Sequence, residues 1–246
     1  MKHTKIRMAR AATVIVAAFA IGSLGTAAPA TAAEPPTGYP TQQIMTTANN
    51  PTVGSIPIRR GFWNADYPGG DRGWGMDKAW NKHNIWSLEA MRRVLLSTNV
   101  TPQGAQYLLK AYAGKYTCSG SVCKLTDQRE IYGIYNSMTY STYYDWPVCG
   151  KLGLQTMYCN QGGAWSCPNW VTYSITNPGV NNPYSSPNPS SKALTRVEPS
   201  LSAEQQMAQA TALASEEIVT LTAAIAAGDE QVSFSYTSLP KEIPAR

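Results

Sequence analysis

The sequence predicts an α+β fold, with N-terminal helices packed on a small antiparallel β-sheet and a separate C-terminal helix. Three observations lead to this prediction. Apolar residues recur at helical spacing between about residues 76 and 113, short β-branched and aromatic runs follow between 129 and 175, and a second helical stripe begins after residue 202. Helices followed by strands are typical of the α+β class.

Residues 1–33 have the composition of a secretory signal peptide. Four basic residues precede the short apolar run AATVIVAAFAIGSLG, and small residues at 28–33 offer a cleavage site. A membrane anchor is the alternative, but the run is shorter than the roughly 20 apolar residues of a membrane span. We expect a secreted, extracellular protein with no membrane insertion in its mature form. Loss of the four basic residues lowers the net charge from +5 to +1.

The mature chain is expected to begin with an extended N-terminal arm and to continue with the α+β body. The arm, residues 34–58, is rich in Pro, Thr, Gly and Asn and has no periodicity. The body, residues 59–175, opens with a helix from Met76 to about Asn84, and Ser87 is placed to cap a second helix.

A third helix is expected to begin at Thr101, with Pro102 in its first position, and to end at Gly114. The residue pattern changes from helical spacing to short strand-like runs after residue 116. Four short runs there predict an antiparallel meander: 129–135, 138–144, 151–159 and 167–175.

The C-terminal part is expected to consist of a linker and an acidic tail. Residues 176–201 are dominated by Asn, Pro and Ser, as linkers are. In the tail, residues 202–246, Ser202 and Gln205 form a capping box, and an apolar stripe runs to Gly228. Residues 197–246 hold seven acidic and two basic residues. This asymmetry is a hint that the body binds a polyanion, although ordinary scatter of solvated charge explains it equally well.

All five cysteines lie in the mature chain, and an exported protein should oxidise them. Cys118 and Cys123 enclose four residues and predict a small loop clip. Cys159 and Cys167 flank a turn sequence and are placed to bridge a hairpin, which would leave Cys149 unpaired. In the alternative, Cys149 pairs with either Cys159 or Cys167. An odd count leaves one thiol in both cases.

The mature chain has a single histidine, His83, so any histidine chemistry depends on it. One histidine excludes HExxH and multi-histidine metal sites. There is no GxSxG elbow, and the Gly-rich segment near residue 70 lacks the GK[ST] of a P-loop. We therefore expect neither a metal nor a cofactor. A lone histidine is also a common structural residue, and that interpretation stays open.

The neighbours of His83 favour chemistry on a phosphodiester. Lys78 and Lys82 precede it, and a base among fixed cations suits attack by a 2′-hydroxyl, with the cations stabilising the developing negative charge. Trp80, with other nearby tryptophans, is placed to stack on unpaired bases. The alternative is that the tryptophans belong to the core and the cations to a solvated surface.

The pattern Gly73-x-Gly75-x-x-Lys78-x-x-x-Lys82-His83 and the later segment Gly153-Leu154-Gln155-Thr156-Met157-Tyr158 resemble secreted bacterial ribonuclease toxins of the barnase/EndoU/RelE-like group. The resemblance covers about residues 60–175. It implies that His83, Lys82, Thr156 and Tyr158 are catalytic and that Arg129 joins Lys78 and Trp80 in binding substrate. It also implies single-stranded RNA as substrate and a cognate immunity protein as partner.

Our first hypothesis is thus a secreted, metal-independent endoribonuclease that acts by 2′-hydroxyl transphosphorylation. The alternative, from another class, is a secreted, disulfide-stabilised, non-catalytic module that binds polysaccharide or a cell surface. Seven Trp, fourteen Tyr and only 14% charged residues suit that alternative. Cell-wall hydrolysis by paired carboxylates is a third hypothesis, for which no convincing acidic pair stands out.

Overall fold

The computed structural model describes residues 34–67, 70–161, 165–179 and 201–245, which belong to one compact unit. The predicted signal peptide, residues 1–33, lies outside the described residues. Most of the predicted linker, residues 180–200, lies outside them as well.

The fold is mostly β, with 45% strand and 25% helix, and its helices are mainly C-terminal. The prediction of N-terminal helices on a small sheet is therefore wrong. The centre of the molecule is a six-stranded antiparallel sheet instead. Its strands are β5 Val100–Gln103, β6 Gln106–Ser119, β7 Val122–Tyr143, β8 Trp146–Asn160, β9 Glu230–Ser235 and β10 Glu242–Pro244.

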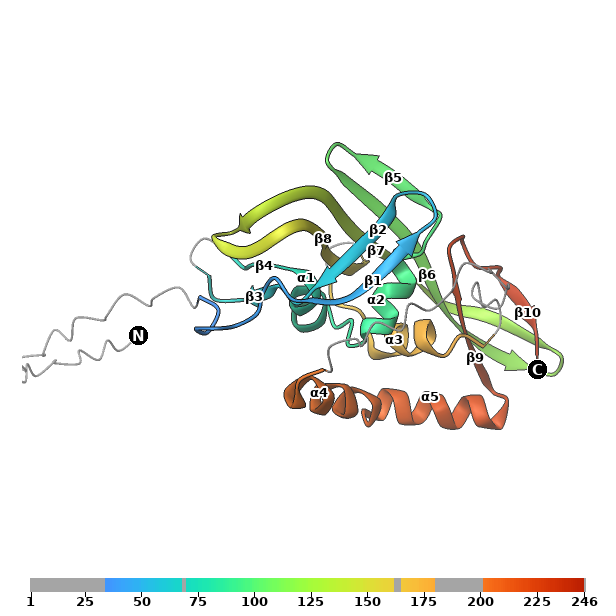
Figure 1. Ribbon diagram of the computed structural model, residues 1–246. Coiled ribbons are helices and arrows are strands. Elements are labelled where there is room, and N and C mark those ends of the chain that lie inside the picture. Colours follow the sequence, from blue (N-terminus) through green and yellow to red (C-terminus); the bar gives the residue numbers. More distant parts are fainter. Residues whose placement is uncertain (1–33, 68–69, 162–164, 180–200, 246) are drawn as a thin grey trace, which may run out of the picture. The chain divides into compact units, whose positions relative to one another are not determined.

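Strand β7, which is 22 residues long, pairs with three other strands of this sheet (Figure 1). One of its edges pairs with β6, and the other pairs with β8 and, near its start, with β10. The far edge of β6 pairs with β5 and, further along, with β9. The last residues of the chain thus add strands to both sides of the β6–β7 hairpin.

Residues 101–114, expected to form a helix, belong to the β5–β6 hairpin. Gly104 has a φ of +65° and lies in the tight turn between Gln103 and Gln106. Leu109, Ala111 and Ala113 alternate into the core, and each has no exposed surface. The apolar residues fit a period of two as well as a helical period, and pairing with β7 selects the strand.

Part of the expected extended arm also folds. Strands β1 Ile44–Asn50 and β2 Gly54–Arg59 form an antiparallel hairpin. Met45, Ile56 and Ile58 on it are buried in the main hydrophobic core. Within the expected arm, only the segment before residue 44 and the turn at residues 51–53 lie outside strands and helices.

Short elements follow this hairpin: β3 Phe62–Asn64, β4 Arg72–Trp74, α1 Gly75–Asp77, the π-helix η1 Lys78–Lys82 and α2 Leu88–Leu95. Helix α2 begins after Ser87, whose hydroxyl accepts a hydrogen bond from the Ala90 N–H. This is the cap that the sequence predicts.

Most of the segment 167–175, expected to be a strand, belongs to α3 Asn169–Thr176. Trp170, Val171, Ser174 and Ile175 are buried, and this spacing is that of one helix face. The tail holds two helices, α4 Ala203–Leu213 and α5 Glu216–Ala227. The Ser202–Gln205 capping box is present at the start of α4.

The main core lies between one face of the sheet and helices α2 and α3, which contact β6, β7 and β9. Disulfides join Cys118 to Cys123 and Cys159 to Cys167, and Cys149 is a free, exposed thiol. Two disulfides indicate an oxidising compartment, extracellular or periplasmic.

Within the described residues, no single helix is long and apolar enough to cross a membrane. Helices α4 and α5 meet the same criteria only when taken as a pair, and the pair is bent by 53°.

Candidate functional site

His83, the residue on which the sequence analysis centres, is buried, with 4% of its surface exposed. Its Nδ1 lies 2.9 Å from the backbone oxygen of Trp165. Because a carbonyl oxygen only accepts, the Nδ1–H donates and Nε2 is left as the acceptor of the neutral ring. The backbone oxygen of His83 accepts from the Cys167 N–H at 2.9 Å, so the Cys159–Cys167 bridge and the histidine position each other.

Burial and the two nearby lysines keep the His83 ring neutral. Burial lowers the pKa of His83 to about 4, the hydrogen bond to Trp165 opposes this change, and Lys82 and Lys78 add to it. The His83 ring centroid lies 5.6 Å from that of Tyr158, which in turn lies 5.0 Å from Trp165. The ring is therefore an uncharged member of an aromatic cluster at physiological pH.

The structure brings Lys78 and Lys82 to His83, but one of these cations is already paired. Lys82 forms an ion pair with Asp71, which also accepts from the Trp63 indole at 3.2 Å. Burial and the charge of Lys82 lower the pKa of Lys78, against an opposing effect of Asp71. This arrangement leaves less free positive charge beside the histidine than the sequence indicates.

Two predicted substrate-binding residues are held in other contacts, although Trp80 lies one helical turn before His83 and accepts a hydrogen bond from its backbone N–H. Trp80 is 7% exposed and belongs to the main core, so it presents little surface to a nucleobase. Arg129 forms an ion pair with Asp127 at 2.9 Å. It also lies on the opposite face of β7 from Glu130, because side chains alternate along a strand. The structure therefore does not assemble the whole predicted site in one place.

Thr156 and Tyr158 lie on the face of the sheet opposite helices α2 and α3. The strand register of β6, β7 and β8 arranges this face in three rows. The rows are Tyr112–Glu130–Asn160, Lys110–Tyr132–Tyr158 and Leu108–Ile134–Thr156. We call these nine residues the outer face.

Glu130 is the polar centre of the outer face. Its Oε1 accepts from the Tyr112 hydroxyl at 3.2 Å, and its Oε2 accepts from the Tyr132 hydroxyl at 2.7 Å and the Asn160 amide at 3.2 Å. Burial works against ionisation here, but these three hydrogen bonds and the charge of Lys110 lower the pKa of Glu130. The result is an ionised, oriented carboxylate among aromatic rings on a sheet surface.

Aromatic side chains continue the outer face towards His83. Tyr132 and Tyr158 are in edge contact at 5.7 Å, and Lys110 Nζ lies 5.6 Å from the Tyr132 ring. Trp165, at the other side of Tyr158, is 47% exposed. Sequence reasoning missed Tyr112, Tyr132, Asn160 and Trp165. The spacing of Glu130-x-Tyr132 and of Tyr158-x-Asn160 places each pair on one face of its strand. Only the strand register shows that the two pairs lie side by side.

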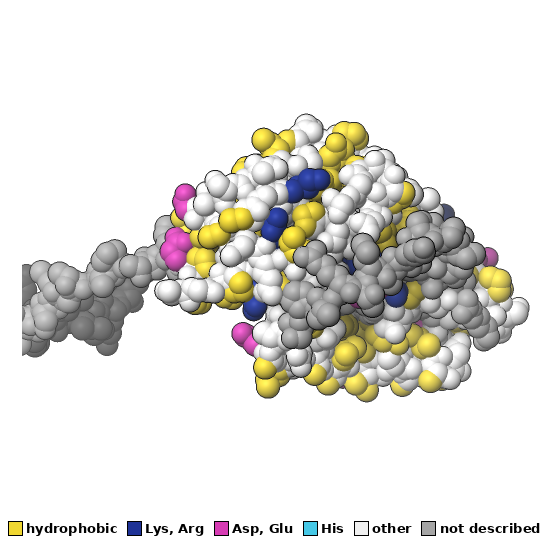
Figure 2. All heavy atoms as spheres, viewed as in Figure 1, with side chains coloured by type: hydrophobic (Ala, Val, Ile, Leu, Met, Phe, Trp, Pro, Cys, Tyr) yellow, Lys and Arg dark blue, Asp and Glu magenta, His cyan; other side chains and the backbone are white. Residues whose placement is uncertain are grey.

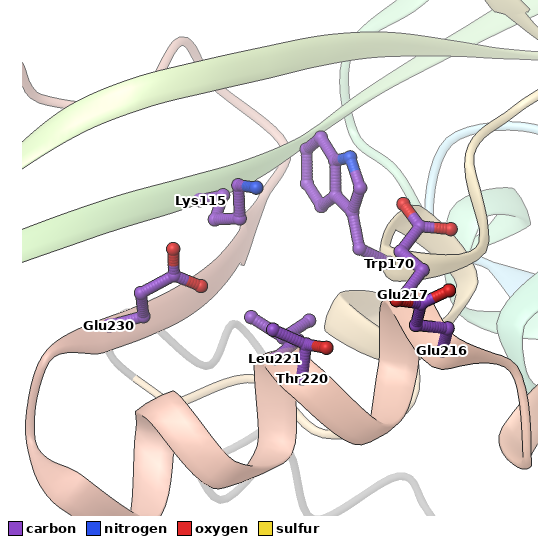
Figure 3. A pocket seen from close by; sticks show the side chains of 7 residues that line it. All are labelled: Lys115, Trp170, Glu216, Glu217, Thr220, Leu221 and Glu230. Carbon is purple, nitrogen blue, oxygen red and sulfur yellow. The ribbon is translucent and has the colours of Figure 1, made fainter.

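Two hollows lie outside the outer face, and each is lined by more acidic than basic side chains. One, of about 330 Å³, lies between α3, α5 and strands β6 and β9, and carries Lys115, Trp170 and three glutamates (Figure 3). The other, of about 540 Å³, lies along α4 and includes Glu204 and Asn84. The three glutamates of the first hollow repel a phosphate backbone, and the second hollow holds no cation to attract one. In the view of Figure 2, charged side chains lie scattered among hydrophobic and uncharged ones.

Among residues 34–67, 70–161, 165–179 and 201–245, no three His, Cys, Asp or Glu side chains come together in a way that could hold a metal ion. Comparison with protein families, curated proteins and solved structures finds no match to this chain.

Proposed function

We propose that this is an exported, non-catalytic module that binds a polysaccharide of a cell surface through its outer face and the adjoining Trp165. The proposal depends above all on Glu130, a carboxylate held by Tyr112, Tyr132 and Asn160 on an open sheet surface. Export rests on the predicted signal peptide and on the two disulfides.

The chemistry of the outer face suits a sugar. Sugar hydroxyls donate and accept hydrogen bonds, and carboxylate, amide and phenol groups complement both roles. The apolar face of a pyranose ring packs on an aromatic ring, and exposed Trp and Tyr rings offer that surface at little entropic cost. Trp165 and Tyr158 provide the rings, while Glu130 and Asn160 fix the orientation.

The ribonuclease hypothesis remains a prediction and ranks second. In its favour, neutral His83 lies close to Lys78 and Lys82, as a base for 2′-hydroxyl attack requires. Against it, the ring is 4% exposed, and a base must come within about 3 Å of the proton that it removes. A pKa of about 4 also makes the ring a weak base at neutral pH.

Binding to insoluble cell-wall polysaccharides, followed by affinity electrophoresis in soluble glycans, tests the proposal. We expect Trp165→Ala and Glu130→Gln to weaken binding about five- to tenfold each, from the lost stacking and charge-assisted hydrogen bonds. Tyr144→Ala is the matched control, because Tyr144 is a 38% exposed aromatic residue in the β7–β8 turn, outside the outer face. Equal loss in all three variants, or no glycan binding by the native protein, would contradict the proposal.

A further inference from the structure

Four aromatic side chains form a continuous series across the outer face and beyond its edge. They are Tyr112 on β6, Tyr132 on β7, Tyr158 on β8 and Trp165, which follows β8 in the sequence. We call these four residues the aromatic path. The three tyrosines are half-buried and Trp165 is 47% exposed, so the path presents ring surface to solvent on each strand that it crosses.

Short contacts join each residue of the aromatic path to the next. The Tyr112 and Tyr132 hydroxyls donate to the two oxygens of the Glu130 carboxylate, at 3.2 and 2.7 Å. The ring centroids of Tyr132 and Tyr158 are 5.7 Å apart, and those of Tyr158 and Trp165 are 5.0 Å apart. One sugar unit of an extended chain has a similar length, so the path has room for about three consecutive units, one for each step across strands about 4.8 Å apart.

The last ring of the aromatic path is held in place by the protein itself. The Trp165 backbone oxygen accepts from the His83 Nδ1–H at 2.9 Å. Two residues further on, the Cys159–Cys167 disulfide ties the chain back to β8, and the Asn84 amide donates to the Cys167 backbone oxygen at 2.8 Å. These bonds exist before any ligand binds, which lowers the entropic cost of binding at this ring.

Neighbouring rings of the aromatic path do not share a plane. The ring planes of Tyr132 and Tyr158 are inclined at 73°, and those of Tyr158 and Trp165 at 79°. Sheet twist adds to this difference, because adjacent strands are rotated by roughly 20–25° relative to one another. The face of a crystalline polysaccharide is flat, so rings this far from coplanar cannot all lie against it. A single chain turns at its glycosidic bonds and is able to follow them.

We infer that the aromatic path binds an internal stretch of a single, linear polysaccharide chain, about three sugar units long, and not a crystalline surface or a chain end. This inference rests on the proposed function and names the class of glycan that the outer face takes. Recognition of a chain end needs a wall that closes the site. Here Ser235, the register partner of Tyr112 on β9, is small, and Trp165 at the other end of the path is widely exposed.

Isothermal titration calorimetry of the full mature protein, with both disulfides formed, measures the number of sugar units that are recognised. The probes are cello-oligosaccharides and chito-oligosaccharides of one to six units. In the series that binds, we expect Kd to fall about two- to tenfold with each added unit up to about three units, and then to stay constant. A methyl group on the reducing end should leave Kd unchanged.

A pull-down assay compares crystalline and soluble forms of the same polysaccharides. Crystalline cellulose or chitin should bind about tenfold more weakly than its soluble derivative, hydroxyethyl cellulose or glycol chitin, because neighbouring rings cannot stack together on a flat face.

Variants at the two ends of the aromatic path test its length. Trp165→Ala removes the last ring, so Kd should become constant about one unit earlier in the series. Tyr112→Phe keeps its ring and loses only the hydroxyl that donates to Glu130, so it should weaken binding of all lengths alike. Tyr144→Ala, outside the outer face, should change neither the affinity nor the length dependence.

The outcomes separate this inference from the proposed function. If the native protein binds none of these glycans, the proposed function fails and the inference fails with it. If it binds glycans, the inference alone is overturned by equal affinity for one unit and for six, by loss of binding when the reducing end is methylated, or by equal or tighter binding to the crystalline form.

Discussion

Two buried groups with opposite titration behaviour should nearly cancel in the acid stability of this protein. Asp77, 4% exposed, accepts a hydrogen bond from the Tyr39 hydroxyl, and Arg60 donates to that hydroxyl at 2.9 Å. Burial raises the pKa of Asp77 to about 6, against the opposing effects of Tyr39 and Arg60. Burial lowers the pKa of His83 to about 4.

The direction in which each group changes the stability follows from the number of protons bound in the folded and unfolded states. Between pH 6 and 4 the folded state binds more protons at Asp77 than the unfolded state does, so stability rises as the pH falls. At His83 the unfolded state binds more protons between pH 6.5 and 4, so stability falls. Each shift of slightly more than two pH units corresponds to about 3 kcal/mol, of which about 2 kcal/mol develops between pH 6.5 and 4.5. The contributions of Asp77 and His83 should therefore nearly cancel each other in this window.

Single substitutions remove the cancellation. Asp77→Asn should lose about 2 kcal/mol of stability between pH 6.5 and 4.5, because the contribution of His83 is then no longer opposed by that of Asp77. His83→Gln, which keeps a donor for the Trp165 carbonyl, should gain about 2 kcal/mol over the same window. Urea unfolding followed by tryptophan fluorescence, under non-reducing conditions, measures both slopes. A flat profile in either variant would refute the reasoning.

Three further predictions concern the fold and the ribonuclease hypothesis. Gly153→Ala should destabilise the protein by about 3 kcal/mol or more, because φ is +84° and a Cβ would lie 1.9 Å from the Pro57 oxygen. Gly133→Ala, which meets only flexible side chains, should cost clearly less in the same urea unfolding assay. Ser87→Ala should cost about 1 kcal/mol and Ser87→Gly a few tenths, as N-caps do, measured as thermal midpoints. If RNA is a substrate, mature protein should leave 2′,3′-cyclic phosphate ends on single-stranded RNA in EDTA, and His83→Ala should reduce the rate about 10²-fold; intact RNA would rule this out.

Local signals in the sequence predict local structure well. The caps at Ser87 and Ser202 depend on hydrogen bonds within a few residues, and both are present. Gly228, with φ +84°, ends α5 for an equally local reason. The two disulfides follow from spacing, because each closes a short loop.

Structure that depends on distant partners could not be predicted in this way. Residues 101–114 satisfy both a helical and a strand period, and only pairing of β6 with β7 and β9 decides between them. Residues 169–176 are β-branched and aromatic, yet they form a helix that packs on α2 and β6. The outer face was missed for the same reason, since Tyr112, Glu130 and Asn160 meet only through strand register.

Strands β9 and β10 follow all the other strands and helices in the sequence, so they are the last strands that can join the sheet during synthesis. A ribosome delivers β6 more than a hundred residues before β9, which covers the edge of β6 at Tyr112–Thr117. Until then that edge carries unpaired backbone groups, which favour pairing with other chains. Strands β5 and β8 pair with other parts of the β6–β7 hairpin, so the edges left unpaired until β9 and β10 are synthesised are Tyr112–Thr117 of β6 and Val122–Lys124 of β7.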